Sequence, residues 1–240
     1  MTSKLEERVT EEYFRPGVLG IIINPFYIAR KGLITNIKEL GREISGKTLD
    51  VGCGTKPYKN YFNSIEYIGL EIETTPHKKA HADVFYEGGK FPFNDKEFDS
   101  VVTNQVFEHV FNPDDFMKEI NRVLKPAGKL LMTVPFVWDE HEQPYDFARY
   151  SSFGIKSILE SHGFEILLSR KSVPDIKVIF QLLNGYIYKK TVHSKILRQI
   201  ATILIMFPLN VLALVLSKIL PSNEDLYLDN IILARKTNNV

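Results

Sequence analysis

Short apolar segments alternate with helical segments through most of the chain, and this alternation restricts the possible folds more than any other feature of the sequence. Amphipathic helical spacing appears at 114–126 and 151–164. We expect the first of these helices to begin after Asn112 and to end at Pro126 and Gly128. Strands that alternate with helices predict an α/β fold with a doubly wound sheet. The segments with the length and composition of strands are 47–52, 66–72, 80–85, 98–104, 128–136, 165–170 and 226–236.

The alternation stops between residues 173 and 224, where the chain is apolar and locally basic. We therefore predict an N-terminal helical lead-in over 1–45, an α/β domain over 46–172 plus 225–237, and an apolar helical insertion over 173–224. Within the lead-in, glycine, proline and basic residues interrupt the apolar stretch 18–40. We expect this stretch to form a short apolar segment and an amphipathic helix, not a membrane span.

The composition excludes several classes of protein. With 44% hydrophobic and 25% charged residues, the chain is of the ordinary globular type. The 30 Lys and Arg residues nearly balance the 29 Asp and Glu residues, which argues against a nucleic-acid partner. Cys53 is the single cysteine, so an internal disulfide and a cysteine-based zinc site are excluded and a reducing compartment is expected. The charged N-terminus has no apolar core of a secretory signal, and we expect a cytoplasmic protein.

A glycine-rich turn follows the first predicted strand, in the segment LDVGCGTKPY at 49–58, and we expect a helix after it. Gly52 and Gly54 allow a sharp turn and a close approach of a ligand to the backbone at the carboxyl end of the strand. Pro57 stands where a dinucleotide-binding turn has its third glycine, which argues against a pyrophosphate ligand. The carboxylate of Asp50 suits a cationic ligand. A turn whose glycines serve geometry alone is an equal alternative.

Several later residues and segments complete a set of motifs that begins with this turn. They are Glu71, Ala82-Asp83, the stretch from Phe98-Asp99 to Glu108-His109-Val110, and the stretch 124–128. In combination with the turn, they resemble the class I S-adenosylmethionine-dependent methyltransferases over residues 47 to about 170 and the last strand. The resemblance implies a seven-stranded, Rossmann-like sheet whose last strand, at 226–236, is antiparallel to the others.

The resemblance also implies an S-adenosylmethionine site at the carboxyl ends of the first four strands. The Gly52–Gly54 turn would face the methionine part, Glu71 would hold the ribose hydroxyls, and Asp83 would accept from the adenine amino group. Lys56 departs from the pattern, since many relatives have another glycine there. The residues implied to contact the cofactor are Asp50, Gly52, Cys53, Gly54, Glu71, Asp83, Val84, Asn104 and Gln105.

Two polar clusters are candidates for the side of the site that binds the methyl acceptor. The first is Glu108-His109, after the fourth strand. Some quinone O-methyltransferases that resemble the chain carry an extra carboxylate at the position of Gln105 and use a metal. Because this chain has glutamine there, we predict no metal. We favour a helix cap and packing pair for Glu108-His109 over direct catalysis, and His109 remains a candidate contact to the acceptor.

The second cluster lies in the segment WDEHEQPYDFARYS at 138–151, after the fifth strand. This segment resembles methyltransferases of bacterial surface polysaccharides and other envelope components. His141 is a candidate general base, because its unperturbed pKa lies near neutral pH. Arg149 is a candidate clamp for a carboxylate or phosphate, with Tyr145 and Tyr150 beside the acceptor. An Asp146–Arg149 ion pair that only shapes the loop, with the aromatic residues in the core, is an equal alternative.

The insertion contains a run without charged residues at 201–217. The strands before and after it belong to one sheet, which argues against a single membrane crossing. Pro208 and Asn210 are expected to divide the run into two helices. We favour association with a membrane surface over a lid or a dimer interface, because a basic group precedes the run and suits anionic lipid head groups. That group is Lys189, Lys190, His193, Lys195 and Arg198.

These features favour a methyltransferase that uses S-adenosylmethionine and acts on a small-molecule or lipid-linked acceptor, at oxygen in the first place, at the inner face of the membrane. A membrane-associated scaffold that keeps the fold without catalysis is the alternative. A nicotinamide-dependent oxidoreductase is disfavoured, because the third glycine is missing and Asp50 precedes the turn.

Overall fold

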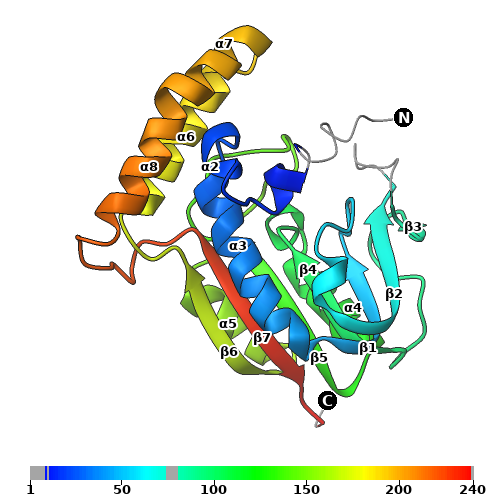
Figure 1. The fold of residues 1–240 in the computed structure, drawn as a ribbon. Helices are drawn as coiled ribbons and strands as arrows, with labels where there is room; N and C mark the ends of the chain where they lie inside the picture. Colours follow the sequence, from blue (N-terminus) through cyan, green and yellow to red (C-terminus); the bar gives the residue numbers. More distant parts are fainter. Residues whose placement is uncertain (1–8, 10, 74–80, 239–240) are drawn as a thin grey trace. The chain divides into compact units, whose positions relative to one another are not determined.

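The structure is a computed structural model that describes residues 9, 11–73 and 81–238. Its contacts divide the chain into two compact units (Figure 1). We call residues 36–136, 140–170 and 229–240 the sheet unit, and residues 1–35, 137–139 and 171–228 the helical unit. The three-part division predicted from the sequence remains a proposal, since the contacts place the lead-in and the insertion in the same unit.

The sheet unit contains a seven-stranded sheet in the order β3-β2-β1-β4-β5-β7-β6. Strand β1 pairs in parallel with β2 and β4, β2 with β3, and β4 with β5, whereas β7 pairs antiparallel with β5. This arrangement confirms the predicted doubly wound α/β sheet with an antiparallel last strand. The strands are β1 (Ser45–Val51), β2 (Asn63–Ile72), β3 (Val84–Tyr86), β4 (Phe98–Asn104), β5 (Leu124–Pro135), β6 (Phe164–Ser172) and β7 (Asp229–Lys236).

The third strand is shorter than predicted from the sequence. Strand β3 covers only Val84–Tyr86 of the predicted 80–85, and Ala80 lies outside the described residues. Asp83, directly before β3, instead bonds to β2 through its backbone N–H, which donates to the Gly69 carbonyl at 2.9 Å. The predicted site residue Asp83 therefore lies at the start of β3, beside the carboxyl half of β2.

Helix α4 (Pro113–Val123) ends before the predicted Pro126 and Gly128. Leu124 already has extended backbone angles and pairs with Phe98 of β4, so the chain enters β5 directly after the helix. Asn112 occupies the predicted N-cap position, but its side chain makes no capping hydrogen bond. The second predicted helix is α5 (Ser152–Ser161), where the Ser151 side chain accepts the capping bond from the Gly154 N–H.

The helix predicted after the glycine turn is wrong. Between β1 and β2 the described chain contains only a 3-10 turn, η2 (Lys59–Tyr61). Lys56 has a positive φ of 53° and Pro57 has no backbone N–H, so neither residue supports a regular helix at this point. The glycine turn is therefore held by its contacts with β2 and not by a helix.

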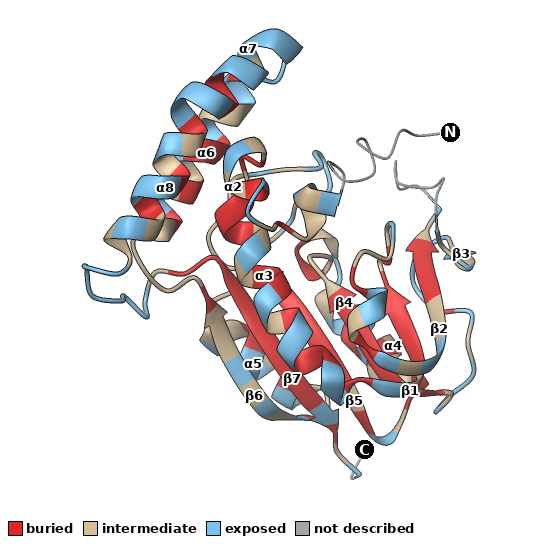
Figure 2. Ribbon diagram, viewed as in Figure 1, coloured by how far each residue is buried: buried red, intermediate tan, exposed pale blue. Residues whose placement is uncertain are grey.

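A hydrophobic core fills the sheet unit around β1, β4 and β5 and includes Leu49, Val101, Leu130 and Ile232. Figure 2 shows buried positions along the central strands and exposed ones toward the outer helix faces. The buried Lys236 closes the end of β7, because its Nζ donates to the carbonyls of Asn121 and Leu124 at 2.6 and 2.9 Å. The core thus fixes the strands whose ends carry the predicted site.

The helical unit contains α2 (Gly20–Ile23), the first part of α3 (Tyr27–Leu40), α6 (Lys177–Thr191), α7 (Lys195–Ala201) and α8 (Phe207–Leu216). The predicted division of the apolar run at Pro208 is wrong, since α7 and α8 form one helical stretch from Lys195 to Leu216. A π-helical turn, η4 (Thr202–Met206), joins them. The wider turn accommodates Pro208, which offers no N–H and whose ring would clash with the carbonyl four residues earlier in a regular helix.

Polar side chains lie inside the helical unit. Gln181 of α6 accepts from the Ala29 N–H at 3.0 Å and donates to the Pro25 carbonyl at 3.1 Å. Asn184 donates to the Asn210 side chain at 2.9 Å, and Asn210 donates to the Ile21 carbonyl at 3.0 Å. These buried amides fasten α6 and α8 to the N-terminal segment.

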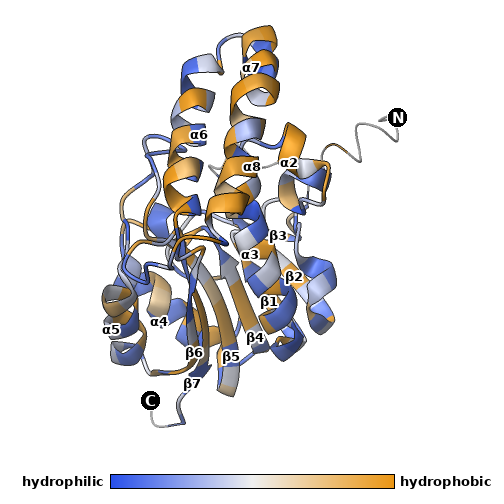
Figure 3. Cartoon of the chain, turned by 60° about the vertical axis from the view of Figure 1, so that its left-hand side comes forward, coloured by the Kyte–Doolittle hydropathy of each residue, from blue (hydrophilic) through white to orange (hydrophobic). Residues whose placement is uncertain are grey.

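Large apolar side chains lie outside the same helices. Figure 3 shows the apolar residues of α6, α7 and α8. The exposed ones are Ile179, Leu183, Ile196, Leu197, Ile200, Ile203, Leu204, Ile205, Val211, Leu212 and Val215. This arrangement reverses the usual one for a helix of a soluble protein, in which the apolar stripe faces the core. The segment Lys195–Leu216 is also long and apolar enough to cross a membrane, and only 28% of its most apolar stretch is buried.

The core around β5 provides a test of the sheet unit. Leu130 is fully buried in β5, and we expect Leu130→Ala to lower the free energy of unfolding by about 2–5 kcal/mol, because it removes buried methyl groups and leaves a cavity. Ile65 of β2 is 92% exposed, and Ile65→Ala should cost less than about 1 kcal/mol. Chemical denaturation measures both values, and equal costs would contradict the assignment of the core.

Candidate functional site

The glycine turn is bound to β2. The backbone N–H groups of Gly52 and Cys53 donate to the Leu70 carbonyl at 2.9 and 3.2 Å, and the Gly54 N–H donates to Glu71 Oε2 at 2.9 Å. Gly52 has a φ of +71°, and a Cβ atom there would overlap the Val106 side chain. Gly54 has a φ of +47° and open space where a Cβ atom would lie. The turn thus leaves an accessible backbone surface at the carboxyl end of β1.

Asp50, at the end of β1, is buried and accepts a hydrogen bond from the Tyr67 hydroxyl at 2.6 Å. Burial raises the pKa of Asp50 to about 7, although the bond from Tyr67 opposes the shift. Burial also raises the pKa of the buried Cys53 thiol to about 12, so this cysteine is not a reactive thiolate. Asp50 and Cys53 therefore support the turn from within the sheet.

Asp83 has a partner that the sequence did not predict. Its Oδ2 accepts from Lys56 Nζ at 2.5 Å and from the Gly69 N–H at 2.7 Å. Partial burial acts to raise the pKa of Asp83, but the bonds from Gly69 and Lys56 outweigh it and hold that pKa below its usual value. The carboxylate stays ionised, and its side chain is about half exposed (49%). Lys56, the residue that departs from the family pattern, therefore lies at the position predicted to read the adenine.

The remaining predicted cofactor residues lie at the ends of neighbouring strands. Glu71 is buried near the end of β2. Val84 is the first residue of β3. Asn104 ends β4, and Gln105 follows it with a φ of +56° and donates its N–H to the Thr133 carbonyl at 2.9 Å. The sheet order places these ends side by side, because β3, β2, β1 and β4 are successive neighbours. The structure thus gathers the residues that the sequence assigned to one ligand.

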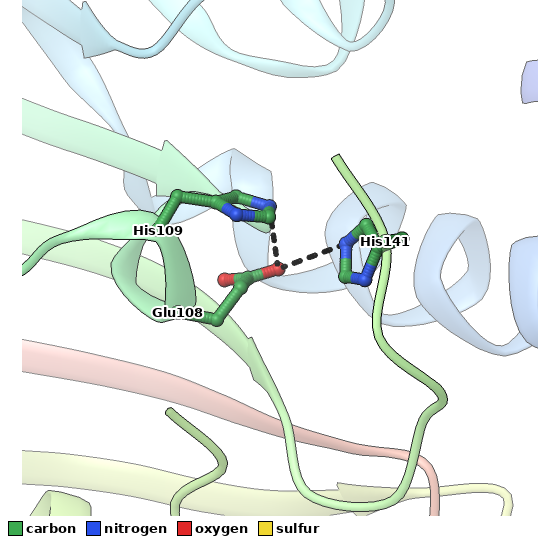
Figure 4. A group of neighbouring side chains, drawn as sticks. All are labelled: Glu108, His109 and His141. Carbon is green, nitrogen blue, oxygen red and sulfur yellow. Dashed lines mark ion pairs between the residues drawn. The ribbon is translucent and has the colours of Figure 1, made fainter. Parts of the chain in front are cut away.

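A second group of side chains, from the two loops after β4 and β5, consists of Glu108, His109 and His141 (Figure 4). Glu108 and His109 belong to a 3-10 turn, η3 (Phe107–His109), and His141 follows β5. The Nε2 atoms of His109 and His141 lie 3.7 and 3.9 Å from the same oxygen, Oε1 of Glu108. We call these three residues the Glu108 cluster.

Glu108 is fully buried. Neither of its carboxylate oxygens has a hydrogen-bond partner within the part of the chain that the structure describes. Burial raises the pKa of Glu108 to about 8, although the Arg149 charge opposes the shift. The predicted cap and packing pair stays a prediction, and Glu108 lies within the 3-10 turn η3 and not at the start of an α-helix.

The other ring nitrogen of each histidine is held in place. His109 Nδ1 lies 2.8 Å from the Tyr145 carbonyl oxygen, and His141 Nδ1 lies 3.2 Å from Asp146 Oδ2. Because the Tyr145 carbonyl is an acceptor, His109 Nδ1 carries the proton and its Nε2 turns a lone pair toward Glu108. His141 Nδ1 also lies 3.4 Å from the Arg149 Nη2 donor. Asp146 is fixed in turn by Arg149, which donates to both of its oxygens at 2.5 and 2.6 Å.

Asp146 remains ionised. Burial acts to raise the pKa of Asp146, but hydrogen bonds from Arg149 and from the His141 backbone lower it to about 2. The loop-shaping ion pair that the sequence left as an alternative is thus present. Two Arg149 nitrogens already donate to Asp146 within the loop. A role of Arg149 in binding the acceptor stays a prediction.

The two predicted tyrosines differ in position. Tyr145 is 57% exposed and contributes its backbone carbonyl to His109. Tyr150 packs on Phe107 with ring centroids 4.9 Å apart and belongs to the edge of the core. Sequence reasoning missed the role of Asp146 behind His141 and the unpartnered state of Glu108. A carboxylate five residues after His141 was the available signal for the first.

The helical unit contains a cavity of about 390 Å³ that the sequence did not predict. Lys189 forms an ion pair with Asp139 at 2.7 Å at its edge. Apolar walls with a charged rim suit an amphiphilic molecule. The lining residues are Trp138, Asp139, Gln181, Leu182, Gly185, Tyr186, Lys189 and Lys190.

Comparison with known proteins finds a methyltransferase domain in part of the chain. Residues 49–132, which include the end of β1, the glycine turn, β4 and most of β5, match the family described as "Methyltransferase domain". An uncharacterised protein of Methanocaldococcus jannaschii is 28% identical over 52% of this chain and 67% of its own length. The mitochondrial ubiquinone biosynthesis O-methyltransferase of Rattus norvegicus is 33% identical over 39% of this chain and 32% of its own length. The chain thus spans from about a third to two thirds of these two relatives.

Solved structures agree on the fold. The phosphoethanolamine N-methyltransferase 2 of Haemonchus contortus, solved with S-adenosyl-L-methionine, has a TM-score of 0.56 with this chain. The alignment covers 99% of this chain and 61% of that one at 18% identity, so the likeness concerns the fold alone. The sheet order, with β7 antiparallel to β5, is that of a Rossmann-like α/β fold. Residues 49–132 of the sheet unit thus match a methyltransferase domain.

The two glycines of the turn allow a paired test. We expect Gly52→Ala to lower the free energy of unfolding by about 2–4 kcal/mol, because a left-handed backbone and the overlap with Val106 both oppose a Cβ atom. Gly54→Ala adds only the backbone cost, about 1–2 kcal/mol, since the space beside it is open. Denaturation curves measure both, and an equal or larger loss for Gly54→Ala would contradict the geometry of the turn.

Proposed function

We propose that the chain is an S-adenosylmethionine-dependent methyltransferase that acts on a small or lipid-linked acceptor at an oxygen atom. The observation that carries the proposal is the glycine turn, with Glu71 and Asp83 at the ends of neighbouring strands. The O-methyltransferase name of the Rattus norvegicus relative supports oxygen as the methylated atom. The fold and the motifs alone fit methylation at nitrogen as well.

The residues present fit this cofactor. Open space beside Gly54 gives a ligand access to the backbone, and two carboxylates in the region, Asp50 and Glu71, favour a cationic ligand. The half-exposed Asp83 carboxylate is an acceptor for an amino group. The cofactor supplies a methyl group on a sulfonium, which is already activated for transfer. The protein therefore mainly has to align donor and acceptor and exclude water.

The loops after β4 and β5 are the proposed acceptor side. They follow the strand ends that adjoin the cofactor residues, and loops at this edge of such sheets carry function. His141 is the residue we propose to act on the acceptor, because Asp146 fixes its ring at Nδ1 and its Nε2 is the nitrogen left for proton transfer. A scaffold without catalysis would not need this arrangement in addition to an intact cofactor turn.

Calorimetric titration of the purified chain with S-adenosylmethionine and S-adenosylhomocysteine tests the proposal. We expect one site in the wild type and a loss of affinity of at least about 10-fold in Asp83→Ala, which removes a charge-assisted acceptor. His141→Ala should bind the cofactor as the wild type does, but should fail to transfer labelled methyl groups to lipid and small-molecule extracts.

The matched control for His141→Ala is His193→Ala, an exposed position of the helical unit, which should keep both cofactor binding and transfer. Absence of binding by folded wild-type protein would overturn the methyltransferase proposal and favour the scaffold. Unchanged transfer in His141→Ala would remove His141 from the mechanism.

We also propose that the helical unit attaches the protein to the cytoplasmic surface of a membrane. Its helices carry amides inside and large apolar side chains outside, the arrangement that suits a lipid environment. Strands β6 and β7, which flank the helices in the chain, are neighbours in one sheet, so the chain leaves and re-enters the sheet on one side. This supports helices that lie in the membrane surface and not a single crossing.

The basic residues between α6 and α7 support anionic lipid as the partner. Lys189, Lys190 and Lys195 are exposed close to the apolar positions Ile196 and Leu197. Each basic residue near an anionic surface contributes about 1 kcal/mol. The cavity beside Trp138 and Tyr186 in the same unit has room for part of an amphiphilic acceptor, which is why we include lipid-linked acceptors in the proposal.

Flotation with vesicles tests the attachment. We expect the protein to float with vesicles of phosphatidylglycerol and phosphatidylcholine, and the double variant Lys190→Ala/Lys195→Ala to partition about 30-fold less, since two basic residues contribute about 2 kcal/mol. The control Lys118→Ala/Lys156→Ala removes two exposed lysines of the sheet unit and should float as the wild type does. Wild-type protein that remains a monomer in solution in the presence of these vesicles would contradict the proposal.

A further inference from the structure

The Glu108 cluster has a feature that the proposed methyl transfer does not require. A carboxylate is buried without a hydrogen-bond partner among the described residues, yet two imidazole rings stand beside it. A buried carboxylate without a partner is costly, because it loses its hydration and receives nothing in return. Buried charges of this kind are normally paired or coordinate a metal.

Neither histidine is within hydrogen-bond distance of Glu108. His109 Nδ1 donates to the Tyr145 carbonyl, so its Nε2 faces Glu108 with a lone pair. His141 is held at Nδ1 by Asp146 and Arg149, and its Nε2 also faces Glu108. A lone pair and a carboxylate oxygen that point toward each other repel unless a proton or a metal cation lies between them. An imidazole held at one nitrogen by an acceptor, with the other nitrogen presented to a common point, is the usual environment of a histidine that binds a metal.

The distances agree with a three-ligand site. One ligand atom from each of the three residues can be chosen so that all lie within 4.8 Å of one another. Tetrahedral ligands at about 2.0–2.1 Å from zinc are about 3.4 Å apart. The separations of 3.7 and 3.9 Å from Glu108 Oε1 to the two Nε2 atoms therefore need only a small closure of the side chains.

We propose that Glu108, His109 Nε2 and His141 Nε2 bind one divalent transition-metal ion, zinc in the first place. Two imidazole nitrogens and one carboxylate favour zinc and its neighbours over magnesium or calcium, which prefer oxygen ligands. Three protein ligands leave at least one coordination position open.

The open position gives the ion a role in the proposed methyl transfer. This role depends on the proposed function, whereas the metal site itself does not. An acceptor hydroxyl bound there would have a lowered pKa, would lose its proton to water and would be held in position for methyl transfer. His141 would then act as a ligand of the ion and not as a general base. Asp146 would be the positioning residue, since it holds the Nδ1–H of His141 and is fixed by Arg149.

This inference differs from the sequence prediction that the chain has no metal. That prediction depended on Gln105, which is not a member of the cluster and donates its side-chain amide to Thr133 Oγ1 at 3.3 Å. The third ligand comes from His141, in the loop after β5, which the sequence alone could not place beside Glu108.

Metal binding by the full chain provides the test. Protein stripped with a chelator is titrated with Zn²⁺ in a calorimeter, and the metal content is measured after dialysis. We expect one equivalent to bind, and Glu108→Gln and His141→Ala to weaken binding by at least about 100-fold, because loss of a partner behind a ligand alone costs about 10–100-fold. Asp146→Asn, which changes the partner behind a ligand, should weaken Zn²⁺ binding by about 10–100-fold. With Co²⁺, the visible spectrum should report nitrogen and oxygen ligands in low coordination.

The matched control is Glu142→Gln, an exposed carboxylate next to His141, which should bind Zn²⁺ as the wild type does. Glu108→Gln is expected to fold, since it removes an unpartnered buried charge, and circular dichroism checks this. Equal affinity in the wild type and Glu108→Gln, or no binding by the wild type, would overturn the metal site. Cofactor titration of the stripped protein separates the two proposals, because S-adenosylmethionine binding without metal leaves the methyltransferase proposal intact.

Discussion

The attachment of the glycine turn to β2 is the interaction on which the proposed site depends. Leu70 and Glu71 hold the backbone of three consecutive turn residues, in a chain that has no α-helix between β1 and β2 within its described part. Glu71 therefore has two roles, because the same carboxylate fixes the turn and is proposed to hold the cofactor ribose. A ligand that bonds to Glu71 would also act on the turn, so binding and the rigidity of this edge are coupled.

The fold of the sheet was predictable, because the strand-like segments and the order of the motifs along the chain both indicate it. Details that depend on tertiary contacts were not. Pairing of Leu124 with Phe98 ends α4 early, and the left-handed Lys56 replaces the expected helix after the turn. The ion pair of Lys56 with Asp83 joins residues 27 positions apart, and no local pattern shows it. The same limit applies to Glu108 and His141, whose meeting requires the ends of β4 and β5 to be neighbours.

The two units use polar groups in opposite ways. In the sheet unit, apolar residues fill the core and buried polar groups gather at the strand ends, where chemistry is proposed. In the helical unit, Gln181, Asn184 and Asn210 form interior connections beside a small apolar cluster, and many large apolar residues of the helices are exposed. Hydrophobicity alone found the helices of this unit, but it gave no information on which face would be buried, because nearly every position of the run is apolar.

The amides of the helical unit also join distant parts of the chain. The bond from Gln181 to Pro25 spans 156 residues, and the bond from Asn210 to Ile21 spans 189. During synthesis, the N-terminal segment therefore waits until most of the chain has left the ribosome before its carbonyl groups find these partners. Until Asn210 has been made, the segment around Ile21 and the apolar run are both without these contacts.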